Sequence, residues 1–206
     1  MENIQVLYIH GGETFKNHDD YLMYLKTREI TLDKQPSWSG SLAENLGDDF
    51  NFARLNMPLK ENAQYEDWKI NFERYLPFIK DNVILVGFSL GAIFLVQYLS
   101  ENKFPKKIFA IYLVATPFDG DLPGADLAGG FRLQSDLSLM SENCSRINFL
   151  FSKNDDVVPV SHAGKFAEKL PGARITILDH INGHFFIPEF PELIEMIKED
   201  VENSRE

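Results

Sequence analysis

One stretch of sequence, from Asn82 to Ser100, does most to limit what this chain can fold into. Residues Asn82 to Gly87 form a short apolar run that is typical of a buried parallel strand. Leu90 to Ser100 is apolar almost all round, as expected of a helix packed against a sheet. The two runs meet in Gly-Phe-Ser-Leu-Gly, so the stretch predicts a strand, a sharp turn at Ser89 and a helix.

A turn of this kind gives its serine an exposed and reactive position. The pattern G-x-S-x-G between a strand and a helix holds the serine in a strained backbone conformation and lifts its hydroxyl clear of the sheet. Gly87 and Gly91 leave room for the close passage of strand and helix. The amino end of the helix favours negative charge beside Ser89. The alternative interpretation is a plain helix start with Ser89 as its N-cap.

The rest of the chain alternates between strand-like and helix-like patterns, which predicts one α/β domain over residues 1–206 with a mainly parallel central sheet. Further strands are predicted at Ile4 to His10, Phe50 to Leu55, Ile108 to Ala115, Ile147 to Phe151 and Arg174 to Leu178. Helices are predicted at Tyr65 to Ile79, Val160 to Leu170 and Pro188 to Val201.

Two connections are longer than a minimal α/β core requires. The first runs over about residues 13–46 and contains a predicted short helix at Asp20 to Lys26. The second runs over about residues 116–145 and is rich in glycine and aspartate. Long connections of this kind are often lids or binding loops. A plain surface excursion is the alternative for each of them.

Composition narrows the classes of partner. The chain has 20 Lys and Arg against 31 Asp and Glu, a formal net charge of −11. This balance argues against nucleic acid and against an anionic membrane surface as partners. A single cysteine, Cys144, and a start without a signal peptide or a membrane-length apolar run predict a soluble, cytoplasmic protein. No metal-ligand spacing or phosphate-binding loop is present, so no cofactor or metal is expected, and the predicted partner is a small-molecule substrate.

A His-Gly-Gly turn follows the first predicted strand. Backbone N–H groups of this turn, together with the N–H of Leu90, can hold the oxyanion of a tetrahedral intermediate. Either Gly12 or Glu13 is expected to supply the first group. His10 is interpreted as a structural side chain, and a simple turn is the alternative for the whole segment.

Acidic residues follow the strand predicted at Ile147 to Phe151. The end of a strand is where the carboxylate of a catalytic triad belongs, and Asp155 and Asp156 both qualify. Asp155, four residues before Pro159, is the preferred acid. Turn-forming aspartates near a helix start are the alternative for at least one of them.

Histidines follow the last predicted strand. His184 lies in a loop after Gly183 and is the predicted base, which would take the Ser89 proton. His180 is its rival, although it directly follows the strand end. His18 and His162 are expected to be surface histidines.

Together these motifs resemble the α/β-hydrolase superfamily. The resemblance rests on Gly-Phe-Ser-Leu-Gly at 87–91, Asp-Asp-Val-Val-Pro at 155–159 and Gly-His-Phe at 183–185, in the chain order serine, acid, histidine. The short chain is similar to the small serine hydrolases, the group that contains retinoblastoma-binding protein 9 and the bacterial YdeN-like proteins. The resemblance implies a three-layer α/β-hydrolase fold and esterase-type chemistry on Ser89.

The expected activity is therefore hydrolysis of a small carboxylic ester by Ser89, His184 and Asp155 through an acyl-enzyme. A thioesterase, an amidase or an acyltransferase would use the same residues. A non-catalytic binding protein that keeps the fold is the alternative from a different class. Phe88, Phe118 and Phe131 are predicted to form an apolar acyl pocket, because they lie beside the motifs or in a predicted lid.

Overall fold

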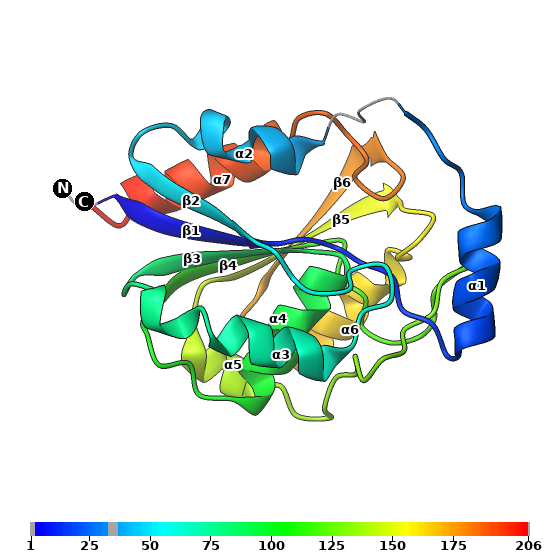
Figure 1. The fold of residues 1–206 in the computed structure, drawn as a ribbon. Coiled ribbons are helices and arrows are strands. Elements are labelled where there is room, and N and C mark those ends of the chain that lie inside the picture. Colours follow the sequence, from blue (N-terminus) through cyan, green and yellow to red (C-terminus); the bar gives the residue numbers. More distant parts are fainter. Residues whose placement is uncertain (1–2, 33–36, 206) are drawn as a thin grey trace.

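The computed structural model describes residues 3–32 and 37–205, which form a six-stranded sheet in the order β2-β1-β3-β4-β5-β6 (Figure 1). Every neighbouring pair of strands is parallel. The predicted α/β fold with a parallel sheet is confirmed. The strands are β1 (Ile4–Ile9), β2 (Phe50–Leu55), β3 (Val83–Phe88), β4 (Ile108–Val114), β5 (Ile147–Asn154) and β6 (Arg174–Asn182).

Helices cover both faces of this sheet, which makes three layers (Figure 1). Two helices lie on one face, α2 (Trp38–Leu46) and α7 (Pro191–Glu202). The other face carries α3 (Tyr65–Glu73), α4 (Leu90–Glu101), α5 (Ser138–Asn143) and α6 (Ser161–Lys169). The remaining helix, α1 (His18–Thr27), stands apart from both layers and has no buried residue. In the described chain, no helix has both the length and the apolar character needed to cross a membrane.

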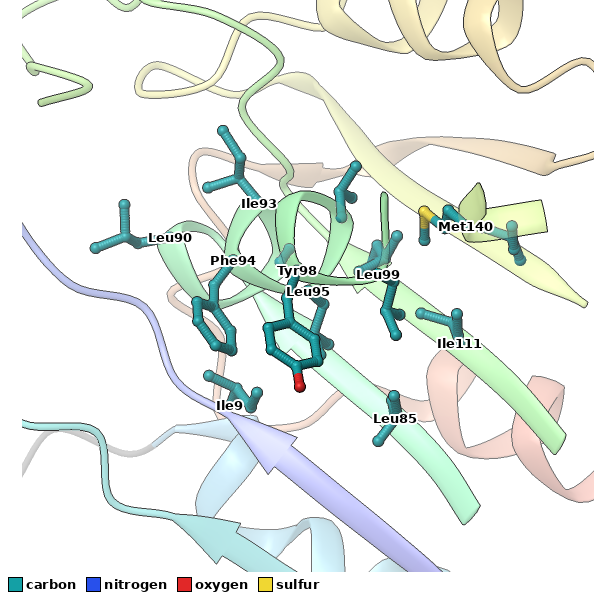
Figure 2. Close-up of a cluster of buried hydrophobic side chains, with 14 of the residues drawn as sticks. Ile9, Leu85, Leu90, Ile93, Phe94, Leu95, Tyr98, Leu99, Ile111 and Met140 are labelled. Atoms are coloured by element: carbon teal, nitrogen blue, oxygen red, sulfur yellow. The ribbon is translucent and has the colours of Figure 1, made fainter. Parts of the chain in front are cut away.

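Helix α4 forms the centre of the larger core. Its side chains pack against the middle strands, where Figure 2 shows Phe94 beside Ile9 of β1. Residues Gly91 to Leu99 are all buried, in agreement with their apolar character all round the helix. Burial of each large apolar side chain contributes about 1.5–3 kcal/mol. Because both faces of the sheet are covered, the central strands are nearly continuous apolar runs.

The order of the strands fixes where a site can form. The chain passes from β1 to β2 on one side and then crosses back to β3 on the other side of β1. In open parallel sheets, the carboxyl ends of strands at such a switch point border a crevice where ligands bind. Here the segments that follow β1 and β3 are Gly11 to Glu13 and Ser89. The topology therefore brings the predicted nucleophile and the predicted oxyanion turn to one crevice.

Several elements differ from their predicted extent or position. The helix predicted over Tyr65 to Ile79 ends at Glu73, and a short 3-10 turn follows at Leu76–Phe78, which contains Pro77. Proline removes a backbone donor and clashes with the preceding helical turn. Strands β5 and β6 continue to Asn154 and Asn182, beyond their predicted ends. Helix α2 lies in a segment that was predicted only as a long connection.

The second predicted lid segment is tied to α6 by His162, which was wrongly predicted as a surface residue. His162 is fully buried (0% exposed). Its Nδ1 accepts a hydrogen bond from the N–H of Phe118 at 2.8 Å, and its Nε2 donates to the carbonyl oxygen of Asp121 at 3.0 Å. The imidazole thus replaces water for two loop groups, which anchors residues 118–121. Of the first predicted lid, residues 33–36 lie outside the described residues.

Replacement of Gly91 by alanine is expected to lower the free energy of unfolding by about 1–3 kcal/mol. A Cβ atom at position 91 would lie 2.4 Å from the carbonyl oxygen of Ile9 and 2.5 Å from that of His10, so α4 would have to move away from β1. Gly40 of α2 is the control, because a Cβ there meets no atom within 4 Å and alanine favours a helix by up to about 1 kcal/mol. Urea unfolding of both variants measures the difference, and equal stabilities would contradict the predicted contact.

Candidate active site

Ser89 occupies the sharp turn between β3 and α4. Its backbone has φ 51° and ψ −117°, a conformation that costs a non-glycine residue about 1–3 kcal/mol. Its N–H donates to the carbonyl oxygen of Val114 at 2.8 Å, and its own carbonyl accepts from Ala92 at 2.9 Å. The Ser89 side chain makes no N-cap hydrogen bond to α4. The interpretation of Ser89 as a simple helix cap therefore loses its physical basis.

The two glycines of the motif are required by close backbone contacts. A Cβ atom on Gly87 would lie 2.7 Å from the Cα of Ala92, and the corresponding atom on Gly91 would strike the carbonyl oxygens at the end of β1. Both contacts involve backbone atoms, which cannot turn aside as a flexible side chain can. The tight turn thus depends on glycine at both positions.

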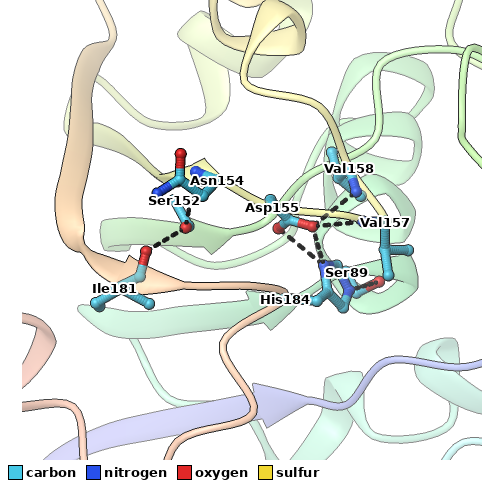
Figure 3. Close-up of polar contacts among 8 residues, drawn as sticks. All are labelled: Ser89, Ser152, Asn154, Asp155, Val157, Val158, Ile181 and His184. Carbon is cyan, nitrogen blue, oxygen red and sulfur yellow. Dashed lines mark hydrogen bonds and ion pairs between the residues drawn. The ribbon is translucent and has the colours of Figure 1, made fainter.

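His184 approaches Ser89 from the loop after β6. Its Nε2 lies 2.9 Å from Ser89 Oγ, the distance of an ordinary hydrogen bond (Figure 3). The chain turns sharply on both sides of the histidine, with φ 71° at Gly183 and φ 55° at Phe185. His184 is only 4% exposed, so its ring is fixed by its surroundings.

Asp155 holds the other side of the imidazole. Its Oδ2 and Oδ1 lie 2.9 and 3.0 Å from His184 Nδ1. Oδ1 also accepts the backbone N–H groups of Val157 at 2.9 Å and Val158 at 2.8 Å (Figure 3). An ionised carboxylate only accepts hydrogen bonds, so Nδ1 carries the proton and Nε2 is left as the acceptor that faces the serine hydroxyl.

The other sequence candidates lie elsewhere. Asp156, the rival acid, is exposed and makes no hydrogen bond to His184. His180, the rival base, is part of β6 and contacts Glu192 on α7. His18 is exposed at the start of α1, as expected. Of the acids and histidines considered from the sequence, the structure brings only Asp155 and His184 into one hydrogen-bonded chain with Ser89.

The two N–H groups predicted for the oxyanion site after β1, those of Gly12 and Glu13, differ in whether the protein already uses them. The N–H of Glu13 donates to the carbonyl oxygen of Lys60 at 2.8 Å, which makes it unavailable to a substrate. Within the described residues, the N–H groups of Gly12 and Leu90 have no acceptor in the protein. A Cβ on Gly12 would lie 2.6 Å from the same Lys60 oxygen. Of the two residues predicted from the sequence, Gly12 is therefore the one whose N–H is not engaged by the described residues, and the same holds for the N–H of Leu90.

His10 positions this segment. Its Nε2 accepts the N–H of Met57 at 3.1 Å, so Nδ1 carries the proton that is donated to the carbonyl oxygen of Gly11 at 2.6 Å. Burial lowers the pKa of His10 below its usual value, and the positive charges of Lys60 and Arg54 act in the same direction. A neutral ring bound to two backbone groups agrees with the structural role expected for His10.

A cavity of about 560 Å³ opens in front of Ser89 and His184. Its aromatic lining includes Phe88, as predicted, but neither Phe118 nor Phe131. Phe118 instead packs on Phe166 of α6, with ring centroids 5.0 Å apart. Phe131 is 2% exposed and its ring lies against those of Tyr65 and Trp68. The prediction that Phe118 and Phe131 line the pocket is therefore wrong. The lining residues missed from the sequence include Tyr8, Tyr24, Trp38, Arg54, Lys60, Phe185 and Phe186.

One group of described residues brings together side chains of the kind that bind metals, Asp119, Asp121 and His162. Both ring nitrogens of His162 are already engaged by backbone groups of the 118–121 loop. The ammonium group of Lys165 lies 2.8 Å from an Asp119 oxygen and 3.7 Å from an Asp121 oxygen. These contacts account for the cluster as a loop anchor, and its donor set does not fit a cation.

Comparison with known proteins places the chain among hydrolases. Residues 33–195 match the family model described as Serine hydrolase. The Bacillus subtilis (strain 168) protein named "Putative hydrolase YdeN" is 29% identical over 136 residues, which covers 66% of this chain and 70% of that protein. The crystal structure of the B. subtilis ydeN gene product has a TM-score of 0.73 at 22% identity, and the match covers 97% of this chain and 100% of that one.

A structure from work on LipS and LipT, two metagenome-derived lipolytic enzymes, has a TM-score of 0.60 at 13% identity and covers 98% of this chain and 94% of that one. At this low identity it shows that the fold is shared. The predicted resemblance to the YdeN-like group of α/β hydrolases is confirmed. The chain belongs to the Serine hydrolase family.

Proposed function

We propose that this hydrolase is a carboxylic ester hydrolase that acts on a small-molecule ester through a covalent acyl-enzyme on Ser89. The observation that carries this proposal is the hydrogen-bonded chain from Asp155 through His184 to Ser89, with Nε2 2.9 Å from the serine oxygen. The adjacent cavity of about 560 Å³ is within the usual size of small-molecule sites.

In the first half of the reaction, Ser89 Oγ attacks the ester carbonyl carbon while its proton passes to His184 Nε2. The Asp155 carboxylate stabilises the resulting imidazolium and keeps the ring in the tautomer that accepts this proton. The carbonyl oxygen becomes an oxyanion, which the N–H groups of Gly12 and Leu90 are placed to bind. Preorganised donors of this kind contribute about 2.7–4 kcal/mol each.

In the second half, the tetrahedral intermediate collapses and the C–O bond to the leaving alcohol breaks. His184 gives its proton to the departing oxygen, and the acyl group stays on Ser89. A water molecule then attacks the acyl carbon, transfers a proton to His184 and releases the carboxylic acid. The serine recovers its proton, and the enzyme returns to its starting state.

Thioesters, amides and acyl transfer to another acceptor would use the same three side chains. Esters are preferred over amides because an alcohol is a better leaving group than an amine, and hydrolysis is preferred over acyl transfer because solvent water reaches the open cavity. The printed description of LipS and LipT as lipolytic supports ester chemistry in this fold. A non-catalytic binding protein is less consistent with a serine held at φ 51° without a capping bond, since that strain has no structural benefit.

A fluorophosphonate probe is expected to label the wild-type protein once per chain, as read by intact mass. The probe reacts only with a serine whose hydroxyl is deprotonated by a neighbouring base, so Ser89→Ala should remove the label completely. Hydrolysis of p-nitrophenyl acetate should fall to background in the same variant. Failure of the well-folded wild type to react would contradict the proposed function.

Asp155→Asn is expected to lower kcat for the same ester by about 10⁴-fold, because the amide stabilises the wrong histidine tautomer and provides no charge for the imidazolium. Asp156→Asn is the matched control, since it removes the same charge one residue away and should leave kcat within about twofold of wild type. Steady-state kinetics on both variants distinguish the two acids. Similar losses in both would mean that Asp155 does not have the assigned role.

A further inference from the structure

One wall of the cavity carries positive charge that no acidic partner among residues 3–32 and 37–205 neutralises. Arg54, near the carboxyl end of β2, lines the cavity together with Lys60. Its guanidinium donates to Ser39 Oγ at 2.5 Å and lies 5.0 Å from the centroid of the Tyr8 ring. No carboxylate of the described residues lies within ion-pair distance of Arg54. In a chain with 31 acidic residues, an exposed arginine on the wall of the Ser89 cavity without an acidic partner in the described part of the chain calls for an explanation.

The acidic residues of the same cavity do not cancel this charge. Glu61 is paired with Arg28, with 3.6 Å between the nearest charged atoms. The Glu13 carboxyl lies near His184, and loss of water around it raises its pKa. Arg54 and Lys60 both act on His10 as positive charges. The cavity thus has its cationic side at Arg54, whereas Lys60 lies next to Glu13, whose N–H donates to the Lys60 carbonyl oxygen at 2.8 Å.

Arg54 is held in a form that suits a planar anion. Its ring contact with Tyr8 and its bond to Ser39 fix the guanidinium while leaving further N–H donors free for a ligand. A fixed guanidinium binds carboxylate or phosphate through paired hydrogen bonds, and less entropy is lost than with a mobile lysine.

The amino end of α2 adds to the positive potential. Ser37, Trp38 and Ser39 begin this helix and all line the cavity. Ser37 makes no side-chain capping bond to the helix, and its hydroxyl bonds to that of Ser39 at 2.9 Å. The N–H groups of Trp38 and Gly40 in this turn already donate to the carbonyl oxygens of Ile187 and Ser37, so the helix end contributes only through its dipole, which favours a nearby negative charge.

Strand register shows that Arg54 is set apart from the reacting atoms. Arg54 pairs with Tyr8 of β1, and Tyr8 pairs with Val86 of β3. Two strand spacings of about 4.8 Å therefore separate the Arg54 backbone from β3, which carries Ser89 at its end. The guanidinium itself is engaged by Ser39 and lies over the Tyr8 ring, not at the Gly12 and Leu90 N–H groups. It can bind a group at the far end of a substrate whose ester carbonyl sits at Ser89.

We infer that this hydrolase prefers esters that bear a carboxylate or phosphate group at the end remote from the scissile bond, and that Arg54 binds this anion with Lys60 beside it. The inference rests on the proposed ester hydrolysis at Ser89. It assigns Arg54 as the residue that determines specificity, and it explains an unpaired cation on the wall of a catalytic cavity.

The test compares p-nitrophenyl esters of one chain length that end in a carboxylate, a phosphate, a methyl ester or a trimethylammonium group. Wild type is expected to show a kcat/KM at least about tenfold higher for an anionic ester than for the methyl ester, the effect of about one charged hydrogen bond. The two anionic esters distinguish carboxylate from phosphate as the preferred group.

Three variants assign the preference to Arg54. Arg54→Gln should reduce the ratio of anionic to methyl ester to about one, mainly through KM. Arg54→Lys keeps the charge without the planar fork and should retain part of the ratio. Arg74→Gln is the matched control, because Arg74 is exposed at the end of α3 and does not line the cavity, so the ratio should stay at the wild-type value.

A readout independent of catalysis separates this inference from the proposed function. Monomethyl adipate, whose free end is a carboxylate, should raise the Tm of Ser89→Ala but not of a folded Ser89→Ala/Arg54→Gln double variant. A Tm shift without any ester hydrolysis by wild type would contradict the proposed esterase function but support the anion site. Equal kcat/KM for all end groups, a preference for trimethylammonium, or a preference that survives Arg54→Gln would overturn the inference.

Discussion

The contact between the first turn of α4 and the carboxyl end of β1 is the constraint on which the site depends. At Gly91 the helix backbone approaches the carbonyl oxygens of Ile9 and His10 so closely that no side chain fits between them. This approach brings the N–H of Leu90 toward the segment that contains Gly12. It also forces Ser89 into its left-handed conformation, since the chain must reverse between β3 and α4 within one residue. The buried face of α4 supplies the packing energy that holds this strained turn in place.

The other two side chains reach Ser89 by different means. Asp155 is held by N–H groups only two and three residues further along its own loop, so its position is a local property of that turn. His184 is 95 residues from Ser89, and its place depends on the pairing of β5 with β6 and on the tight turn around it. A disturbance of β6 would therefore displace the histidine before it affects the aspartate. Parallel strands with their carboxyl ends at one edge make this assembly from distant segments possible.

Apolar runs and short motifs carried most of the correct predictions. The six strands and the sharp turn at Ser89 are each formed by consecutive residues, so the apolar pattern of the local sequence matches the buried environment in the fold. Helix α2 was missed although Trp38, Leu42 and Leu46 recur at a spacing of four, a signal that the sequence does contain. The catalytic assignments were harder. The sequence alone does not show which of Asp155 and Asp156 faces His184, because that depends on where the histidine lies in the fold.

The errors share another cause. Whether His162, Phe118 and Phe131 face solvent, a core or a pocket depends on how the 116–145 connection folds back onto α3, α4 and α6. Nothing in the local sequence of the connection sets these long-range contacts. In the same way, the Glu13 N–H is engaged by the carbonyl oxygen of Lys60, 47 residues later in the chain. Net charge also gives no information on local charge. A chain of net charge −11 still has Arg54 and Lys60 in the lining of its cavity.

The residues that line the cavity come from different elements than Ser89, Asp155 and His184, and this affects how substrate specificity can change. Ser89, Asp155 and His184 come from the ends of β3, β5 and β6. Most other lining residues come from β1 and β2 with the loops that follow them, from α1 and from the start of α2. β2 is an edge strand that pairs only with β1 in the described sheet, and α1 has no buried residue. Substitutions in β2 and α1 can alter what the cavity binds at a small cost in stability. They leave the α4–β1 contact and the hydrogen-bonded chain Asp155–His184–Ser89 unchanged. Substrate preference is therefore expected to follow Arg54 and its neighbours, while the bond-breaking chemistry stays with the conformation imposed on Ser89.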